Sequence, residues 1–123
     1  MRDVTLIYKI ATTAQWQAAQ ANGAFAGAPI DLADGFIHFS TAAQTVETAS
    51  KHFRGLDDLL LLAVDADALG AALRYEASRG GDLFPHLYDS LPLSAVRSAA
   101  PIPMLADGTH DFTGLLSSED AGS

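Results

Sequence analysis

The chain has 123 residues, a formal net charge of -8 and no cysteine. Its length suits one domain, and its 49% apolar content is enough for a core. The absence of cysteine excludes disulfides, thiol catalysis and thiolate metal sites, and it fits a cytoplasmic protein. With 7 Lys and Arg against 15 Asp and Glu, bulk nucleic-acid binding is not expected, although a few arginines in a cleft could hold one phosphate. No apolar run reaches the roughly eighteen residues of a membrane span, so no membrane association is expected.

The first part of the chain predicts a strand, a helix and a long loop. Residues 4–10 alternate and are rich in β-branched and aromatic side chains, which is typical of a strand. Thr12 and Gln15 have the spacing of a capping box, and Gly23 is placed to end the helix that follows. Residues 23–35 contain three Gly, one Pro and two Asp, so we predict a loop, and long loops often carry function.

The middle of the chain predicts a second helix between two strands. Residues 36–40 form a short apolar segment that predicts a strand. Residues 41–54 show helical spacing of apolar side chains, with a further capping box from Thr41 to Gln44. The nearly continuous apolar run of residues 57–65 predicts a strand that is buried on both faces.

The last part predicts further strands. Residues 73–77 alternate, residues 95–99 also indicate a strand, and the segment between them is punctuated by Gly, Pro and Asp around one short extended piece, FPHLY. The order of elements predicts a single α+β domain over residues 1–113, with two early helices and a mostly antiparallel sheet. Residues 114–123 carry Ser, Gly and acids, which predicts a disordered tail.

The stretch DLADGFIHFST suggests a functional site at the end of a strand. His38 and Ser40 lie two residues apart, so a strand would put them on one face. Free N–H groups at the start of the next helix attract anions, and the hydroxyls of Ser40 and Thr41 could add donors. The alternatives are a core histidine that backbone groups satisfy and simple capping by the hydroxyls, which we favour for Thr41.

A second group of candidates follows the strand at residues 73–77. Arg74 and Glu76 share a face of the predicted strand. Arg74 could therefore bind an anion, and Glu76 could act as a general base or ribose ligand. The alternative is a surface ion pair that contributes little to stability. Arg79 stands beside two glycines, where the backbone could approach a phosphate. His86 and Tyr88 share one face of the FPHLY piece, and we favour a site role for His86.

No metal site is predicted. The four histidines have neither HExxH nor other close spacing, and the GxSxG elbow of Ser–His–Asp hydrolases is missing.

The strings IYKIATTAQW, GAPIDLADGFIHFSTAAQ, KHFRG, LRYEASRGGDLFPHLY and LPLSAV resemble the small, largely bacterial domain-of-unknown-function family nine-five-two over about residues 7–112. The resemblance implies an ADP-ribosylation-like fold, with a split, mostly antiparallel α+β sheet around a cleft for NAD. No activity comes with it. In one class of ADP-ribosyltransferases a strand-end His and a small hydroxyl residue hold the nicotinamide ribose, which His38 and Ser40 match. Tyr88 or Tyr75 would stack on the nicotinamide.

The resemblance departs from the transferases at one position. The class needs a catalytic Glu on a late strand, whereas Glu76 comes too early and Glu119 falls in the expected tail. RNA 2'-phosphotransferases share the fold without that Glu and rely on Arg and His. Their chemistry is loosely matched by Arg74, Arg79, His38 and His86.

Three functional hypotheses result. The first is an ADP-ribosyltransferase-like enzyme or binder that acts on NAD, ADP-ribose or a phosphorylated ribose. The second is a small-molecule hydrolase or isomerase in which His38 and His86 act as acid and base and Glu76 orients one of them. The third is a non-catalytic module that binds a metabolite or a protein. A small-molecule ligand is expected, and the oligomeric state is left open.

Overall fold

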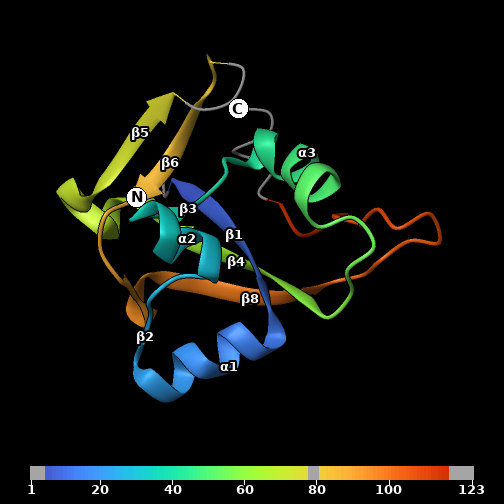
Figure 1. Cartoon of the computed structure of the whole chain (residues 1–123), viewed down its shortest axis with the longest axis horizontal. Coiled ribbons are helices and arrows are strands. Elements are labelled where there is room, and N and C mark those ends of the chain that lie inside the picture. The colour runs from blue at the N-terminus through green and yellow to red at the C-terminus, as the bar shows by residue number, and fades with distance from the viewer. Residues whose placement is uncertain (1–4, 78–80, 117–123) are drawn as a thin grey trace.

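The computed structural model describes residues 5–77 and 81–116 (Figure 1). The described chain is α+β, and every strand pair in it is antiparallel. It contains two three-stranded sheets and one two-stranded pair. This confirms the predicted fold class at the level of an α+β domain with mostly antiparallel sheets.

The first sheet has the order β1-β4-β8 and forms the centre of the molecule. It consists of β1 (Leu6–Thr12), β4 (Leu59–Asp65) and β8 (Val96–Ile102). All but one residue of the middle strand β4 are buried, as its apolar sequence predicts. Its alternate residues enter two separate core clusters, one on each face of the sheet.

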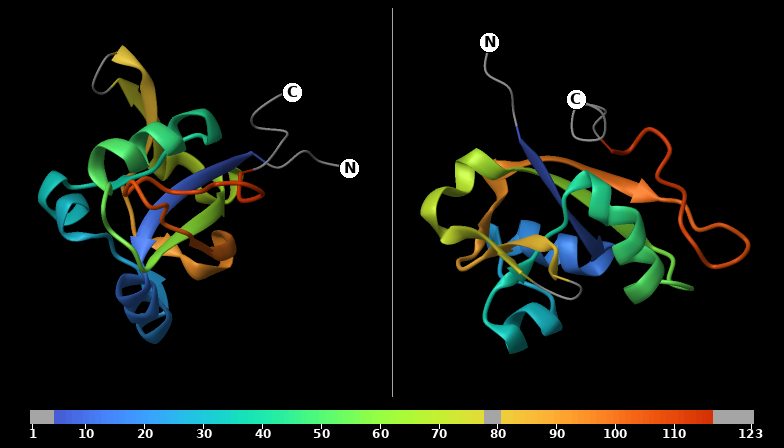
Figure 2. Two further views of the ribbon diagram at one scale, coloured as in Figure 1. Left: turned by 90° about the vertical axis from the view of Figure 1, so that its right-hand side faces the viewer. Right: turned by 90° about the horizontal axis from the view of Figure 1, so that it is seen from above.

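The helices cover both faces of this sheet (Figures 1 and 2). Helix α1 (Thr13–Asn22) belongs to one core cluster and α3 (Ala42–His52) to the other. Thr12 and Gln15 form the predicted capping box, and Gly23 ends α1 in the left-handed conformation with φ 84°. The partly buried Trp16 of α1 packs against the first cluster.

The second sheet has the order β3-β6-β5 and lies at one end of the central sheet, away from α1 (Figure 1). Its strands are β3 (Ile37–His38), β6 (Leu83–Leu87) and β5 (Leu73–Ala77). A β-bridge joins the two sheets, because Tyr8 and Ser40 exchange backbone hydrogen bonds of 2.8 Å in both directions. This bridge holds the end of β3 against the middle of β1.

Three boundaries differ from the sequence-based expectations. The predicted loop at residues 23–35 is wrong, because the segment holds β2 (Ala24–Phe25) and the short helix α2 (Pro29–Asp34), whose first residue is a proline. The predicted strand at residues 36–40 is regular only at β3. The predicted punctuated segment contains β6 and β7 (Leu91–Pro92), where β7 pairs with β2. β2, β7 and α2 are short and contact segments that are distant in sequence, so local patterns do not reveal them.

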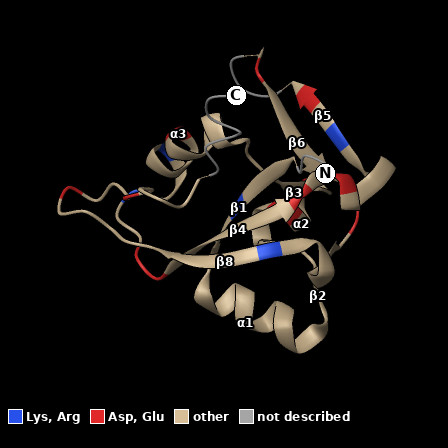
Figure 3. Cartoon of the chain, turned by 180° about the vertical axis from the view of Figure 1, so that it is seen from behind, with Lys and Arg blue, Asp and Glu red and all other residues tan. Residues whose placement is uncertain are grey.

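The remaining connections are helical turns. The 3-10 helices η1 (Ala66–Ala72) and η3 (Leu93–Ala95) lead into β5 and β8, and the latter strand runs to Ile102 rather than ending near residue 99. Within residues 5–77 and 81–116, no helix has both the length and the apolar character needed to cross a bilayer. The strands β5 and β8 carry one basic residue each, Arg74 and Arg97, and they belong to different sheets (Figure 3).

Candidate functional site

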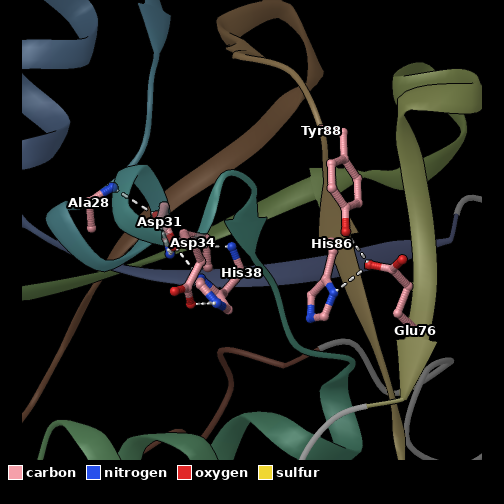
Figure 4. A network of polar contacts seen from close by, with 8 residues as sticks. Ala28, Asp31, Asp34, His38, Glu76, His86 and Tyr88 are labelled. Atoms are coloured by element: carbon pink, nitrogen blue, oxygen red, sulfur yellow. Dashed lines mark hydrogen bonds and ion pairs between the residues drawn. The ribbon is translucent and has the colours of Figure 1, made fainter.

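A buried carboxylate, Asp31 of α2, organises one half of the candidate site (Figure 4). Only 1% of Asp31 is exposed. Its Oδ2 lies 2.8 Å from Lys9 Nζ and accepts the Ala28 N–H at 2.7 Å. Its Oδ1 accepts a 3.1 Å bond from Lys9 Nζ, a 3.1 Å bond from the backbone N–H of His38, and a 2.5 Å bond from His38 Nδ1. Every lone-pair direction of this carboxylate therefore has a donor from β1, α2 or β3.

The local sequence explains why the carboxylate reaches this position. Gly27 has φ 121°, a conformation that disfavours side chains, and a Cβ there would stand 2.9 Å from Asp31 Cβ. Pro29 starts α2 directly afterwards, where its missing N–H costs nothing. Lys9 occupies the same face of β1 as the buried Ile7, so its ammonium group is carried into the core and meets Asp31 there.

Burial and neighbouring polar groups shift the pKa values of Asp31 and Lys9. Burial alone raises the pKa of Asp31, but the hydrogen bond from His38 and the charge of Lys9 outweigh it and lower that pKa to about 2. Burial lowers the pKa of Lys9, while the Asp31 carboxylate acts in the opposite direction. Breaking such a pair leaves one buried charge without compensation, which is strongly destabilising.

His38 contacts a carboxylate through each of its ring nitrogens. Besides the Nδ1 contact with Asp31, its Nε2 lies 3.0 Å from Asp34 Oδ2 at the end of α2. An ionised carboxylate only accepts hydrogen bonds, so Nδ1 carries an N–H toward Asp31, and the Asp34 contact is an ion pair only when the ring is protonated. The side chains of His38 and Asp34 are 34% and 43% exposed. Parts of the ring and of the Asp34 carboxylate are therefore open to solvent.

A second carboxylate–imidazole pair comes from the β5–β6 hairpin. His86 Nδ1 lies 2.9 Å from Glu76 Oε1, and the Tyr88 hydroxyl donates a 2.6 Å hydrogen bond to the same oxygen. The hydrogen bonds from Tyr88 and then His86 lower the pKa of Glu76, and the same Glu76 contact raises the pKa of Tyr88. Because Nδ1 donates to Glu76, a neutral His86 carries its free lone pair on Nε2.

The two imidazoles face one another across the second sheet. His38 and His86 are direct partners in the β3–β6 register, and their ring centroids are 5.7 Å apart in an edge-to-face arrangement. Phe36 packs against both, with its centroid 4.2 Å from that of His86 and 4.7 Å from that of His38. Figure 4 shows the Asp31–His38 group on one side and the His86–Glu76–Tyr88 group on the other. The hairpin and the α2–β3 segment thus bring two carboxylate-held imidazoles into one site.

The other predicted site residues differ in where they lie. Arg74 is at the margin of the site, with its guanidinium carbon 5.1 Å from the centre of the Tyr88 ring. The Ser40 hydroxyl lies 3.1 Å from the Thr48 hydroxyl of α3, so it contacts that helix. Thr41 precedes α3, and its N–H donates to the Gln44 side chain at 3.0 Å, which fits the favoured capping role. Arg79 lies outside the described residues.

Sequence reasoning missed four members of the site. They are Lys9, Asp31, Asp34 and Phe36. One signal was available, because Lys9 shares the alternation phase of Ile7 and Ala11 in an otherwise apolar strand. A charge in a core phase calls for a buried partner. Nothing in the sequence indicated that the partner lies 22 residues later.

A pocket away from the two imidazoles has a volume of about 350 Å³. It is lined by parts of η1 and the β6–β7 turn, among them Leu69, Ala72 and Ser90. Its lining offers little convergent polar chemistry, so we place the candidate site at the two imidazoles. Within the described part of the chain, no three His, Asp or Glu side chains are grouped so as to hold a metal ion.

Comparison with known proteins places the chain among uncharacterised relatives. The X-ray structure of protein CC0527 from Caulobacter crescentus, a structural genomics target, is 53% identical in sequence. The match covers 89% of this chain and 96% of that chain, with a TM-score of 0.86. The solution NMR structure of the same protein is 52% identical, covers 91% and 97%, and has a TM-score of 0.81.

No curated protein matches the chain. The family model described as "Protein of unknown function (DUF952)" matches residues 10–99. These residues include Asp31, His38, Glu76, His86 and Tyr88. The chain therefore belongs to the DUF952 family, as its sequence resemblance suggests.

Proposed function

We propose that the protein is an enzyme that uses His38 and His86 as a general acid–base pair on a small ligand with a phosphorylated ribose. The observation that carries this proposal is the pair of facing imidazoles, each held through Nδ1 by a carboxylate, with ring centroids 5.7 Å apart. A carboxylate at Nδ1 fixes the tautomer and orientation of the ring, so that Nε2 is presented for proton transfer.

The hydrogen-bond partners assign different roles to the two histidines. His86 has one carboxylate partner, so its neutral form has a basic Nε2 that can take a proton from a ligand hydroxyl or from water. His38 has two carboxylate partners, and in its protonated form it can donate the Nε2 proton to a leaving oxygen. The net result is one proton taken up by His86 and one released by His38, and exchange with water restores both.

The proposed ligand class is based on Arg74 and Tyr88, which lie beside the two imidazoles. Arg74 supplies a guanidinium that lies over the ring of Tyr88, and Tyr88 is 42% exposed. A guanidinium and an accessible aromatic ring suit a phosphate joined to a base or a similar planar group. The chain's net charge of -8 argues for recognition of one focused anion rather than a long polyanion.

The test is a turnover screen with matched histidine variants. NAD, ADP-ribose, 2'-phosphorylated nucleotides and 2',3'-cyclic nucleotides would be incubated with the protein and the products followed by NMR. We expect turnover of at least one of them, and a loss of roughly 10²- to 10⁴-fold in His38→Gln and in His86→Gln. The control is His52→Gln, at the exposed end of α3. Turnover that survives both site variants, or no turnover of any ligand by the folded protein, would contradict the proposal.

A second candidate is an ADP-ribosyltransferase-like protein that binds NAD or ADP-ribose without turning it over. It is favoured by the placement of Tyr88 and Glu76 on one face of the hairpin opposite His38, an arrangement that suits a ribose and a stacked ring. The ADP-ribosylation-like fold and a cytoplasmic location are part of this proposal. Calorimetric titration distinguishes it: NAD or ADP-ribose should bind the wild type and bind Tyr88→Ala more weakly, with no product formed.

A further inference from the structure

We propose that Nε2 of His38 is a phosphate subsite that Asp34 of the same chain occupies when no ligand is bound. In this arrangement the Asp34 carboxylate stands in for an anionic oxygen of the ligand, and binding exchanges one for the other. The inference rests on the proposed function in one respect, because it places the ligand's phosphate at the histidine assigned as the acid.

The two carboxylates that contact His38 are held in very different ways. Asp31 is 1% exposed and also accepts bonds from Lys9 and Ala28, so it is a permanent part of the fold. Asp34 is 43% exposed, and its contact within the described part of the chain is the 3.0 Å ion pair with His38. A solvent-exposed ion pair is worth little net free energy, so an external anion can replace it at small cost.

The position of Asp34 also allows its carboxylate to leave. It is the last residue of the six-residue helix α2, and Gly35 follows it in the left-handed conformation with φ 88°. Helix ends fray readily, and a rotation of the side chain there disturbs no core contact. Asp31, one turn earlier, keeps the imidazole oriented through Nδ1 after Asp34 has moved.

The charge balance of the site selects an anion. Lys9 compensates Asp31 within the core, so the charge of a protonated His38 is compensated by Asp34. A ligand that displaces Asp34 restores the same balance only if it brings a negative oxygen of its own. Phosphate oxygens form short, charge-assisted hydrogen bonds with imidazolium N–H groups.

The experiment measures the binding of inorganic phosphate to the whole protein. The imidazole signals of His38 would be followed by NMR during a phosphate titration at constant ionic strength and pH, in wild type and in Asp34→Asn. Removing the internal competitor should tighten phosphate binding by roughly tenfold, as expected for the loss of one competing charge-assisted contact. The matched control is Asp57→Asn, which removes the same charge from an exposed loop position before β4.

The outcomes are distinguishable. Tighter binding in Asp34→Asn but not in Asp57→Asn, and its loss in His38→Gln, support the subsite. Equal affinities in the two aspartate variants, or phosphate shifts confined to other residues, overturn it. Asp34→Ser provides a second variant if Asp34→Asn does not fold. The turnover screen tests the proposed function separately. If the protein turns over no ligand but Asp34→Asn binds phosphate more tightly than the wild type, the subsite stands without the proposed activity. If the protein is active but Asp34→Asn binds phosphate no more tightly, the subsite is refuted and the activity stands.

Discussion

The carboxylates that orient His38 and His86 differ in their surroundings, although both accept a hydrogen bond from a ring Nδ1. Asp31 is buried with a lysine, whereas Glu76 lies at the protein surface and shares its oxygen between His86 and Tyr88. Removing the charged partner of a buried group costs more free energy of folding than removing the partner of an exposed group. Substitutions at Asp31 should therefore change stability, and substitutions at Glu76 should change the chemistry of its neighbours.

The first prediction concerns the Tyr88 hydroxyl. Its pKa is raised by the hydrogen bond to Glu76, so Glu76→Gln should lower that pKa toward the ordinary value. The ultraviolet titration of the tyrosines measures this, and Tyr88→Phe identifies which of the 3 tyrosines is responsible. Glu47→Gln, on the exposed side of α3, is the control that should leave the curve in place. An unchanged tyrosine titration in Glu76→Gln would contradict the contact.

The second prediction concerns acid stability. The folded-state pKa of Asp31 is about 2, below the ordinary aspartate value of 3.8 that applies to the unfolded chain. The stabilisation is therefore fully present above about pH 5 and is lost as the pH falls toward about 2. It amounts to the order of 2 kcal/mol. Urea unfolding at several pH values should show this loss in wild type.

Asp31→Asn should remove that part of the acid dependence. It should also be less stable by about 3–5 kcal/mol near neutral pH, because Lys9 is left buried without its counter-charge. Asp57→Asn should behave like wild type. An Asp31 variant that unfolds with the same pH profile as the wild type would refute the assignment.

At the scale of elements, the short segments owe their structure to tertiary contacts. Helix α2 has six residues, too few to persist alone in water. It is held by the Asp31 contacts with β1 and β3 and by the close approach of Gly27. β3 has two residues and is likewise defined by its pairing with β6. The site therefore depends on elements that form only when the whole domain folds.

The third prediction tests this dependence at Gly27. An alanine there meets Asp31 Cβ at 2.9 Å and must also adopt φ 121°, so Gly27→Ala should displace Asp31 and destabilise the fold. Gly23→Ala is a matched control, because its φ is 84° but its Cβ meets nothing within 4 Å. It should cost about 1–2 kcal/mol, the price of the left-handed conformation alone. Chemical denaturation measures both, and equal losses would contradict the steric argument.

At the scale of the whole molecule, β4 joins the two halves of the core. Its alternate side chains contribute to both hydrophobic clusters, and α1 and α3 cover the opposite faces. The two imidazoles, by contrast, lie on the smaller second sheet, which also contributes Ile37 and Leu87 to one cluster. The central sheet carries most of the core, and the Tyr8–Ser40 bridge connects it to the second sheet.

The fourth prediction follows from this division. Leu62→Ala, at a fully buried position of β4, should destabilise the protein by about 2–5 kcal/mol. Leu83→Ala, at a position of β6 that is 55% exposed, should change the stability by no more than about 0.5 kcal/mol. Urea unfolding monitored by circular dichroism makes the comparison. Similar losses at the two positions would show that the second sheet carries more of the stability than its burial indicates.

Sequence reasoning identified the long elements and part of the site. Apolar periodicity and capping residues predict four elements, because these signals act between residues only a few positions apart. The elements are β1, α1, α3 and β4. His38, Glu76, His86 and Tyr88 were selected from two separate stretches, and the structure brings them together. The loop prediction for residues 23–35 failed because β2 pairs with the distant β7 and α2 is held by a lysine from β1.

The sequence by itself determined that the chain is acidic and α+β with a buried central strand, and it singled out a strand-end histidine in DLADGFIHFST. These are local properties, since periodicity, capping and composition act over a few residues. Only the tertiary structure decided which carboxylate holds which imidazole, because β-sheet pairing joins residues far apart in the chain. It paired Asp31 with Lys9 and His38, and Glu76 with His86. Through these pairings His38 of the DLADGFIHFST stretch and His86 together form the candidate site.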